Sequence, residues 1–100
     1  MTPRAVPVDK TTLDLIRAAQ AGDEDSLLEL YRTTSSMVYT AALGMMASAE
    51  LAETVTAATY VAIWRSQPPA ETTAAGADGW LRRQTLRQAL AIAGRAFRLA

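Results

Sequence analysis

The sequence predicts an all-α fold, a bundle of three to four helices. Apolar residues recur at spacings of three and four through most of the 100-residue chain, no segment reads as a strand, and the four prolines fall outside the periodic segments. Half of the residues are hydrophobic and 20% are charged, which is typical of a globular domain. We therefore expect one helical domain over residues 11–100, after a disordered or extended lead-in over residues 1–10.

Start and stop signals predict the first two helices. Thr11 followed three residues later by Asp14 fits a capping box, and Gly22 supplies a stop, so the first helix should cover about residues 12–21. Acidic residues and renewed apolar spacing then predict a long second helix over about residues 24–46. A Ser-Ser pair at 35–36 weakens helix propensity and allows a bend there.

The third helix and the loop after it are predicted from caps and prolines. Ser48 is the expected N-cap, and the helix should end near Ser66 because Gln-Pro-Pro follows. Pro68 to Gly79 lacks periodicity and reads as a loop, whose length is typical of mobile or functional loops.

The last helix should begin at Asp78 as its N-cap and pack one apolar stripe on the core. That stripe is predicted to hold Leu86, Leu90, Ala93 and Phe97, with Ala89 and Ala96 beside them. A second stripe on the other side holds Arg83, Arg87, Gly94 and Arg98.

Charge is divided unequally between the two parts of the chain. Ten basic and ten acidic residues give a net charge of zero, but no acidic residue follows Asp78, so residues 79–100 carry +5 and residues 1–78, with five basic and ten acidic residues, carry −5. Arginines on one helix face suit phosphate oxygens. The alternative is that they form only the solvated face of an amphipathic helix, and spacing does not decide between the two.

The absence of cysteine and histidine excludes several kinds of site. The chain can form no disulfide, no Cys/His zinc site, no cysteine nucleophile and no imidazole base, so we expect neither an enzyme nor a cofactor. It has no run that resembles a signal peptide or a membrane-spanning helix. A cytoplasmic protein without membrane contact is the expectation.

Aromatic residues flank the predicted loop on both sides. Tyr60 and Trp64 precede it, and Trp80 follows it. Exposed rings beside arginines can stack on single-stranded nucleic acid, whereas tryptophans of a small domain more often lie in its core. Both interpretations stay open at the level of the sequence.

An ordered set of pairs resembles region 2 of the extracytoplasmic-function (ECF) sigma factors. The family pattern is a helix ending in Gly-Asp, a Leu-Tyr followed by a Val-Tyr, a helix closing on an aromatic residue and a Trp, and a last helix opening with Trp-Leu. This chain has, in that order, Gly22-Asp23, Leu30-Tyr31, Val38-Tyr39, Tyr60 with Trp64, and Trp80-Leu81. The resemblance covers residues 13 to about 97.

The resemblance implies two binding surfaces. The family's third helix binds the RNA polymerase core, and its last helix and preceding loop open and read the promoter −10 element. By position, polymerase contact would fall on Glu53, Thr54, Ala57, Ala58 and Arg65. DNA contact would fall on the loop and on Trp80, Arg83, Arg87, Arg95 and Arg98.

This chain departs from the family at several of these positions. Thr54, Ala57 and Ala58 stand where the family usually has an acid, a Gln and another acid, and Ala91 stands where it usually has Asp. The loop has no basic or aromatic side chain, which makes it a poor surface for capturing a base. The 100 residues hold no counterpart of the family's second domain, which reads the −35 element.

These observations leave three expectations for function. The first is a sigma-like domain that binds RNA polymerase core and promoter −10 DNA. The second is a protein-interaction module that keeps the fold but binds a regulatory protein, such as an anti-sigma factor. The third is a self-associating bundle, because the alanines at 57, 58 and 62 suit close helix packing.

Overall fold

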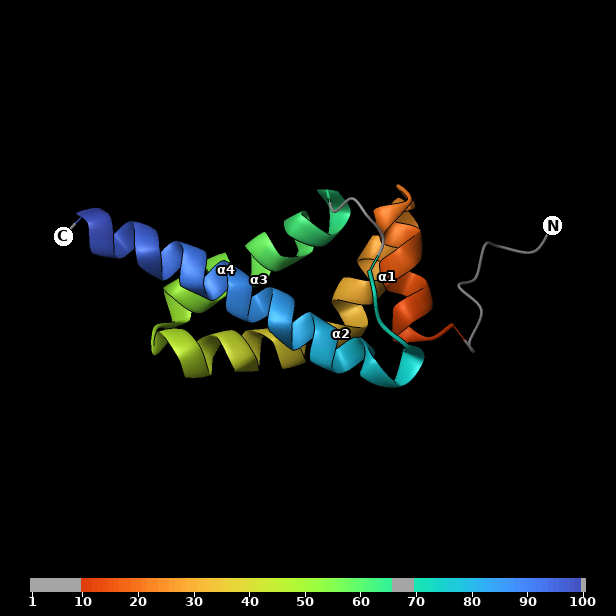
Figure 1. The fold of residues 1–100 in the computed structure, drawn as a ribbon, viewed down its shortest axis with the longest axis horizontal. Helices are drawn as coiled ribbons and strands as arrows, with labels where there is room; N and C mark the ends of the chain where they lie inside the picture. Colours follow the sequence, from red (N-terminus) through yellow and green to blue (C-terminus); the bar gives the residue numbers. More distant parts are fainter. Residues whose placement is uncertain (1–9, 66–69, 100) are drawn as a thin grey trace.

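The computed structural model describes residues 10–65 and 70–99, with side chains up to residue 95. These residues form helices and no strand, which confirms the all-α prediction. Figure 1 shows the elements, which are α1 (Thr12–Gln20), α2 (Glu24–Met46), α3 (Ala49–Arg65), a 3-10 turn (Ala74–Gly76) and α4 (Ala77–Leu99). The predicted lead-in, apart from Lys10, lies outside the described residues, as do Pro68 and Pro69 of the predicted loop and Ser66, the predicted end of the third helix.

Side-chain caps begin the first two helices where the sequence predicts them. Asp14 N–H donates to Thr11 Oγ1 and Thr11 N–H donates to Asp14 Oδ2, both at 3.1 Å, so the capping box of α1 is complete. Asp23 Oδ1 accepts the N–H of Asp25 at 3.1 Å and caps α2. Each cap satisfies an amide that has no partner within its own helix, which explains why both predicted starts are correct.

A tight turn joins α2 to α3. Ala47 ends α2 in the left-handed conformation, with φ 53°, and its N–H donates to the Leu43 carbonyl at 2.9 Å. Ser48 Oγ then accepts the N–H of Leu51 at 3.3 Å, so the serine caps α3 as predicted. Because the turn is this short, α2 and α3 fold back on each other (Figure 1).

Helix α2 bends about its middle (Figure 1), close to the serine pair that the sequence marks. Two threonine hydroxyls bond back to carbonyls one turn earlier: Thr33 Oγ1 donates to Glu29 O at 2.9 Å and Thr34 Oγ1 donates to Leu30 O at 2.6 Å. Such bonds compete with the helix ladder and bend helices. The bend directs the two halves of α2 toward different partners.

The start of α4 differs from the prediction. Asp78 is not its N-cap, because α4 begins at Ala77, directly after a 3-10 turn in which Thr73 Oγ1 accepts the N–H of Gly76 at 3.3 Å. The end of the predicted loop is therefore helical.

The described part of the loop is tied to α1. Ala70 is buried and its N–H donates to Gln20 Oε1 at 2.8 Å, while Arg17 donates to the Thr72 carbonyl at 3.3 Å. These bonds fix the point from which the chain enters α4, which the sequence pattern did not indicate.

Two hydrophobic clusters form the core. The larger one joins α1, α2 as far as Val38, the end of α3 and the start of α4, and contains Ile16, Leu30, Val38, Ile63, Trp80 and Leu81 among others. The smaller one joins the remaining halves of α2, α3 and α4 through Ala42, Ala52, Val55, Ala89 and Ile92. Small side chains dominate the second cluster, so the three helices approach closely there.

The predicted inward stripe of α4 is wrong. Leu86 and Leu90 are 46% and 64% exposed and Ala93 is exposed, whereas the buried residues of α4 up to residue 92 are Ala77, Trp80, Leu81, Thr85, Ala89 and Ile92. Only Ala89 was placed correctly among the residues whose side chains are described. The Ala96, Phe97 and Arg98 side chains lie outside the description.

The reason for this error is that α4 carries two apolar stripes. At about 100° per residue, Leu81 and Leu86 point about 140° apart, and both stripes have helical spacing. The packed stripe includes Thr85, whose hydroxyl donates to the Leu81 carbonyl at 2.9 Å and is thereby satisfied inside the core. The stripe with the larger leucines faces outward.

Candidate interaction surfaces

The outward face of α4 carries arginines that form no ion pair with a described carboxylate. Arg82, Arg83 and Arg87 are all exposed. Among the described residues, the ion pair that the structure contains is between Arg32 and Glu29 of α2, at 3.4 Å, and involves none of these arginines. Arg95 is also exposed, but it lies about 120° around the helix from Arg83. Of the predicted arginine stripe, Arg83 and Arg87 are therefore exposed on one side of α4, and the Arg98 side chain lies outside the described residues.

Leucines share this face with the arginines. Five residues lie within an arc of about 140° around the helix, in the order Arg82, Leu86, Leu90, Arg83 and Arg87. We call these five residues, with Ala93, the outward face of α4. Sequence reasoning did not assign Arg82 to this face, and it placed the leucines inside. The outward face is thus an apolar stripe with guanidinium groups on both sides.

Trp80 does not belong to an exposed surface. It is 8% exposed and packs in the larger core cluster, so of the two interpretations the core is the correct one. As the helix stands, its ring is not available to stack on a base. Tyr60 is also buried, at 5% exposed, whereas Trp64 is half-buried.

The predicted polymerase-contacting residues share one side of α3. Glu53, Thr54, Ala57 and Arg65 are exposed, and Ala58 is partly buried against the smaller core cluster. Their positions fall within an arc of about 140°, so the helix brings them together on one face. We call these five residues the outer face of α3.

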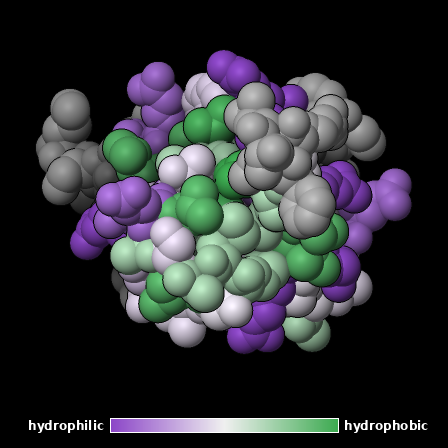
Figure 2. All heavy atoms as spheres, turned by 90° about the vertical axis from the view of Figure 1, so that its left-hand side faces the viewer, coloured by the Kyte–Doolittle hydropathy of each residue, from purple (hydrophilic) through white to green (hydrophobic). Residues whose placement is uncertain are grey.

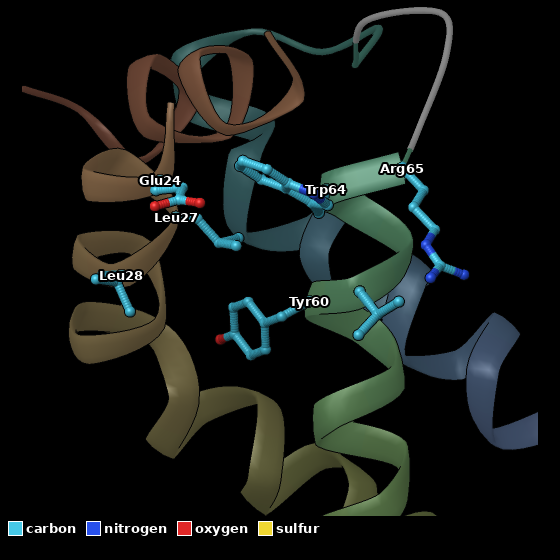
Figure 3. Close-up of a pocket in the computed structure, with 7 residues that line it drawn as sticks. Glu24, Leu27, Leu28, Tyr60, Trp64 and Arg65 are labelled. Atoms are coloured by element: carbon cyan, nitrogen blue, oxygen red, sulfur yellow. The ribbon is translucent and has the colours of Figure 1, made fainter. Parts of the chain in front are cut away.

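A groove of about 420 Å³ runs between the first half of α2 and the end of α3. Figure 3 shows the side chains along it, with Glu24, Leu27 and Leu28 from α2 and Tyr60, Trp64 and Arg65 from α3, and Val61 lines it as well. Leu28 and Val61 are 61% and 48% exposed, so the groove is open and largely apolar. The sequence did not predict it, because it depends on how the bent α2 packs on α3.

A third apolar surface lies at the end of the molecule formed by the α2–α3 turn and the later part of α4. Figure 2 looks onto this end and shows hydrophobic residues gathered on it. The exposed large hydrophobic residues of these segments are Leu43, Met45, Leu51 and Leu90. Residues 33–49 contain no charged side chain, and this uncharged run is a sequence feature that could have indicated the apolar surface.

A buried hydrogen-bond chain supports the groove from below. The Tyr60 hydroxyl lies 2.7 Å from Thr34 Oγ1, which itself donates to the Leu30 carbonyl, so the tyrosine is the donor to the threonine. The Tyr60 ring also packs edge-on against Tyr31, with centroids 5.0 Å apart. Burial raises the pKa of the Tyr60 hydroxyl above 10.0.

This arrangement predicts a loss of stability at alkaline pH. Because the folded-state pKa of Tyr60 is raised, its contribution is complete below about pH 10 and is lost as the pH rises through the folded-state value. Tyr60→Phe should lower the free energy of unfolding by about 1 kcal/mol at neutral pH and flatten the alkaline decline. Urea unfolding at several pH values measures both. Tyr31→Phe, at the neighbouring and more exposed ring, is the control and should reduce the alkaline decline much less, because Tyr31 is the smallest of the causes that raise the Tyr60 pKa. An equal effect of both variants would contradict this account.

Acidic groups at the helix starts behave in the opposite sense. The pKa of Asp14 is lowered by its hydrogen bonds with Thr11, and that of Asp23 by its bonds with Ser26, so the contributions of both carboxylates to stability are lost as the pH falls below 3.8.

Among residues 10–65 and 70–99, no three His, Cys, Asp or Glu side chains are placed to hold a metal ion. In the same residues no helix has the length and apolar content needed to cross a membrane.

Comparison with known proteins gives no relative for this arrangement. No protein-family model matches the chain, and neither the curated proteins nor the solved structures contain a match. The surfaces described above are therefore the basis on which a function can be argued.

Proposed function

We propose that this domain acts in transcription as a sigma region 2-like module, binding RNA polymerase core through the outer face of α3 and DNA through the outward face of α4. The observation that carries the proposal is the presence of two exposed faces on two helices. The outer face of α3 bears the five positions that the ECF resemblance assigns to polymerase, and the outward face of α4 bears Arg83 and Arg87 of those that it assigns to DNA. A protein with these partners acts in the cytoplasm.

The surroundings of α3 support a helical protein partner. The outer face of α3 contains small side chains at Ala57 and Ala58, which permit close approach of another helix. Arg65 belongs both to this face and to the groove, whose exposed Leu28 and Val61 add apolar area beside it. A polar face continuous with an apolar groove is a common composition for a protein interface.

The surroundings of α4 support phosphate contact rather than base reading. Arg82, Arg83 and Arg87 are exposed and form no ion pair within the described part of the chain, so each can bind phosphate oxygens. Trp80 is buried, which removes the ring that would have stacked on a base. Phosphate contacts position a protein on DNA without reading sequence, so we expect weak sequence preference from this domain alone.

The proposed polymerase contact predicts the effect of Ala57→Arg. A long charged side chain at the centre of the outer face of α3 would be buried without a partner in the complex, so binding to RNA polymerase core should weaken at least about tenfold. Pull-down with purified core enzyme measures it, with circular dichroism to confirm the helix content. Ala75→Arg, at an exposed alanine in the 3-10 turn, is the matched control. Unchanged binding of Ala57→Arg would remove α3 from the interface.

A protein-interaction module with the same fold is the second candidate. The observation in its favour is the exposure of Leu86 and Leu90 between the arginines of α4, since phosphate contact gives these leucines no apolar partner. Such a module would bind a regulatory protein in place of promoter DNA.

A further inference from the structure

The geometry points to a specific partner for the outward face of α4: an amphipathic helix of another protein, with an apolar stripe bordered by Asp and Glu. This inference goes beyond polymerase and DNA binding, and it requires neither. It rests on the spacing of the exposed apolar residues, on the charges beside them and on the packing of the opposite side of α4.

The exposed apolar residues have the spacing of a helix-packing seam. Leu86, Leu90 and Ala93 lie at i, i+4 and i+7, which places them in one line along the helix, and this is the pattern by which two helices interdigitate. Leu86 and Leu90 are 46% and 64% exposed. A partner helix that covered them would remove this apolar area from water.

The charges beside the seam specify an acidic partner. Arg82 lies on one side of the leucines and Arg83 and Arg87 lie on the other, and none forms an ion pair with a described residue. In paired helices the positions that border the seam select the partner by charge. A second copy using the same face is disfavoured, because all five charged residues after Asp78 are arginines and would repel their equivalents.

The packing of α4 favours a helix over a lipid surface. The opposite side of α4 is held in the core by Leu81, Thr85, Ala89 and Ile92, so the helix cannot turn to insert more apolar area. Membrane binding by an amphipathic helix grows with the apolar area it buries, and two leucines supply little. A facing helix can cover the same two leucines and place carboxylates beside the three arginines at once.

The test uses the full 100-residue chain and designed probe peptides. Each peptide has about three heptads with leucine at the two seam positions, and carries either glutamate or lysine at the flanking positions. Fluorescence anisotropy with labelled peptide should show the glutamate peptide binding at least about tenfold more tightly than the lysine peptide. The double variant Leu86→Gln, Leu90→Gln should weaken glutamate-peptide binding at least about tenfold.

Charge reversal and a matched leucine make the test specific. Replacing Arg82, Arg83 and Arg87 by Glu should transfer the preference to the lysine peptide, which a merely sticky surface would not show. Leu28→Gln, at an equally exposed leucine of the α2–α3 groove, should leave peptide binding unchanged. Equal binding of both peptides by the unaltered chain would overturn the proposal, and so would loss of binding in Leu28→Gln without loss in the Leu86, Leu90 variant.

Failure of this inference can be told apart from failure of the proposed function. Leu86→Gln, Leu90→Gln keeps all three arginines, so duplex DNA binding should persist in it while peptide binding is lost. Peptide binding without DNA or polymerase binding would support the inference and contradict the proposed function. Binding to vesicles of phosphatidylglycerol without any binding to the glutamate peptide would contradict the inference.

Discussion

Leu81→Ala should destabilise the domain by about 2 to 5 kcal/mol, the largest effect we expect from a single substitution. Leu81 has no exposed surface and belongs to the larger core cluster, where the start of α4 meets α1, α2 and α3. Its carbonyl also accepts the hydroxyl of Thr85, so collapse around the cavity would disturb a second buried group. Urea unfolding followed by circular dichroism measures the change.

Leu86→Ala, at the same residue type in the same helix, is the matched control. Because Leu86 is 46% exposed on the outward face, its truncation should change the free energy of unfolding by no more than about 0.5 kcal/mol. If Leu86→Ala were as costly as Leu81→Ala, α4 would be rotated and its leucine stripe would face the core. Such a result would contradict the assignment of Leu86, Leu90 and the arginines to an exposed face of α4.

The double variant Arg83→Ala, Arg87→Ala should remove most of the salt dependence of DNA binding that α4 provides. Each phosphate contact contributes about 0.9 to the slope of log affinity against log salt, so the slope should fall by about two. Between roughly 50 and 200 mM salt, the accompanying loss of affinity should shrink about tenfold. Titration of a labelled duplex at several salt concentrations measures the slope.

Two arginines outside α4 provide the control for net charge. Arg32→Ala with Arg65→Ala removes the same charge from α2 and α3, where the side chains are also exposed, and should leave the slope nearly unchanged. An equal decrease in both double variants would mean that overall charge, and not the outward face of α4, attracts the DNA. A slope unaffected by Arg83→Ala, Arg87→Ala would remove α4 as the DNA contact.

Helix bounds could be predicted because local chemistry sets them. The capping box of Thr11 and Asp14, the Asp23 cap and the Ser48 cap each involve residues within one turn, so sequence alone contains the information. The start of α4 was misplaced because the Thr73 cap begins a 3-10 turn that continues directly into the helix. A 3-10 turn leaves no clear signal in a segment rich in Ala, Thr and Gly.

The orientation of α4 could not be predicted because it depends on tertiary packing. Both of its stripes have helical periodicity, and hydrophobicity favoured the one with Leu86 and Leu90. The core instead takes the stripe with Thr85 and Ala89, whose small side chains allow close approach to α2 and α3. The groove between α2 and α3 was missed for a related reason, since it follows from the bend in α2.

Competition for RNA polymerase core is the decisive test of the proposed function. The chain is titrated against purified core enzyme carrying a labelled, intact ECF sigma factor, with fluorescence anisotropy as the readout. Our account predicts displacement of the label at micromolar concentrations of the domain, and a marked loss of displacement by Ala57→Arg. Absence of displacement at tens of micromolar of the unaltered domain would contradict the proposed function.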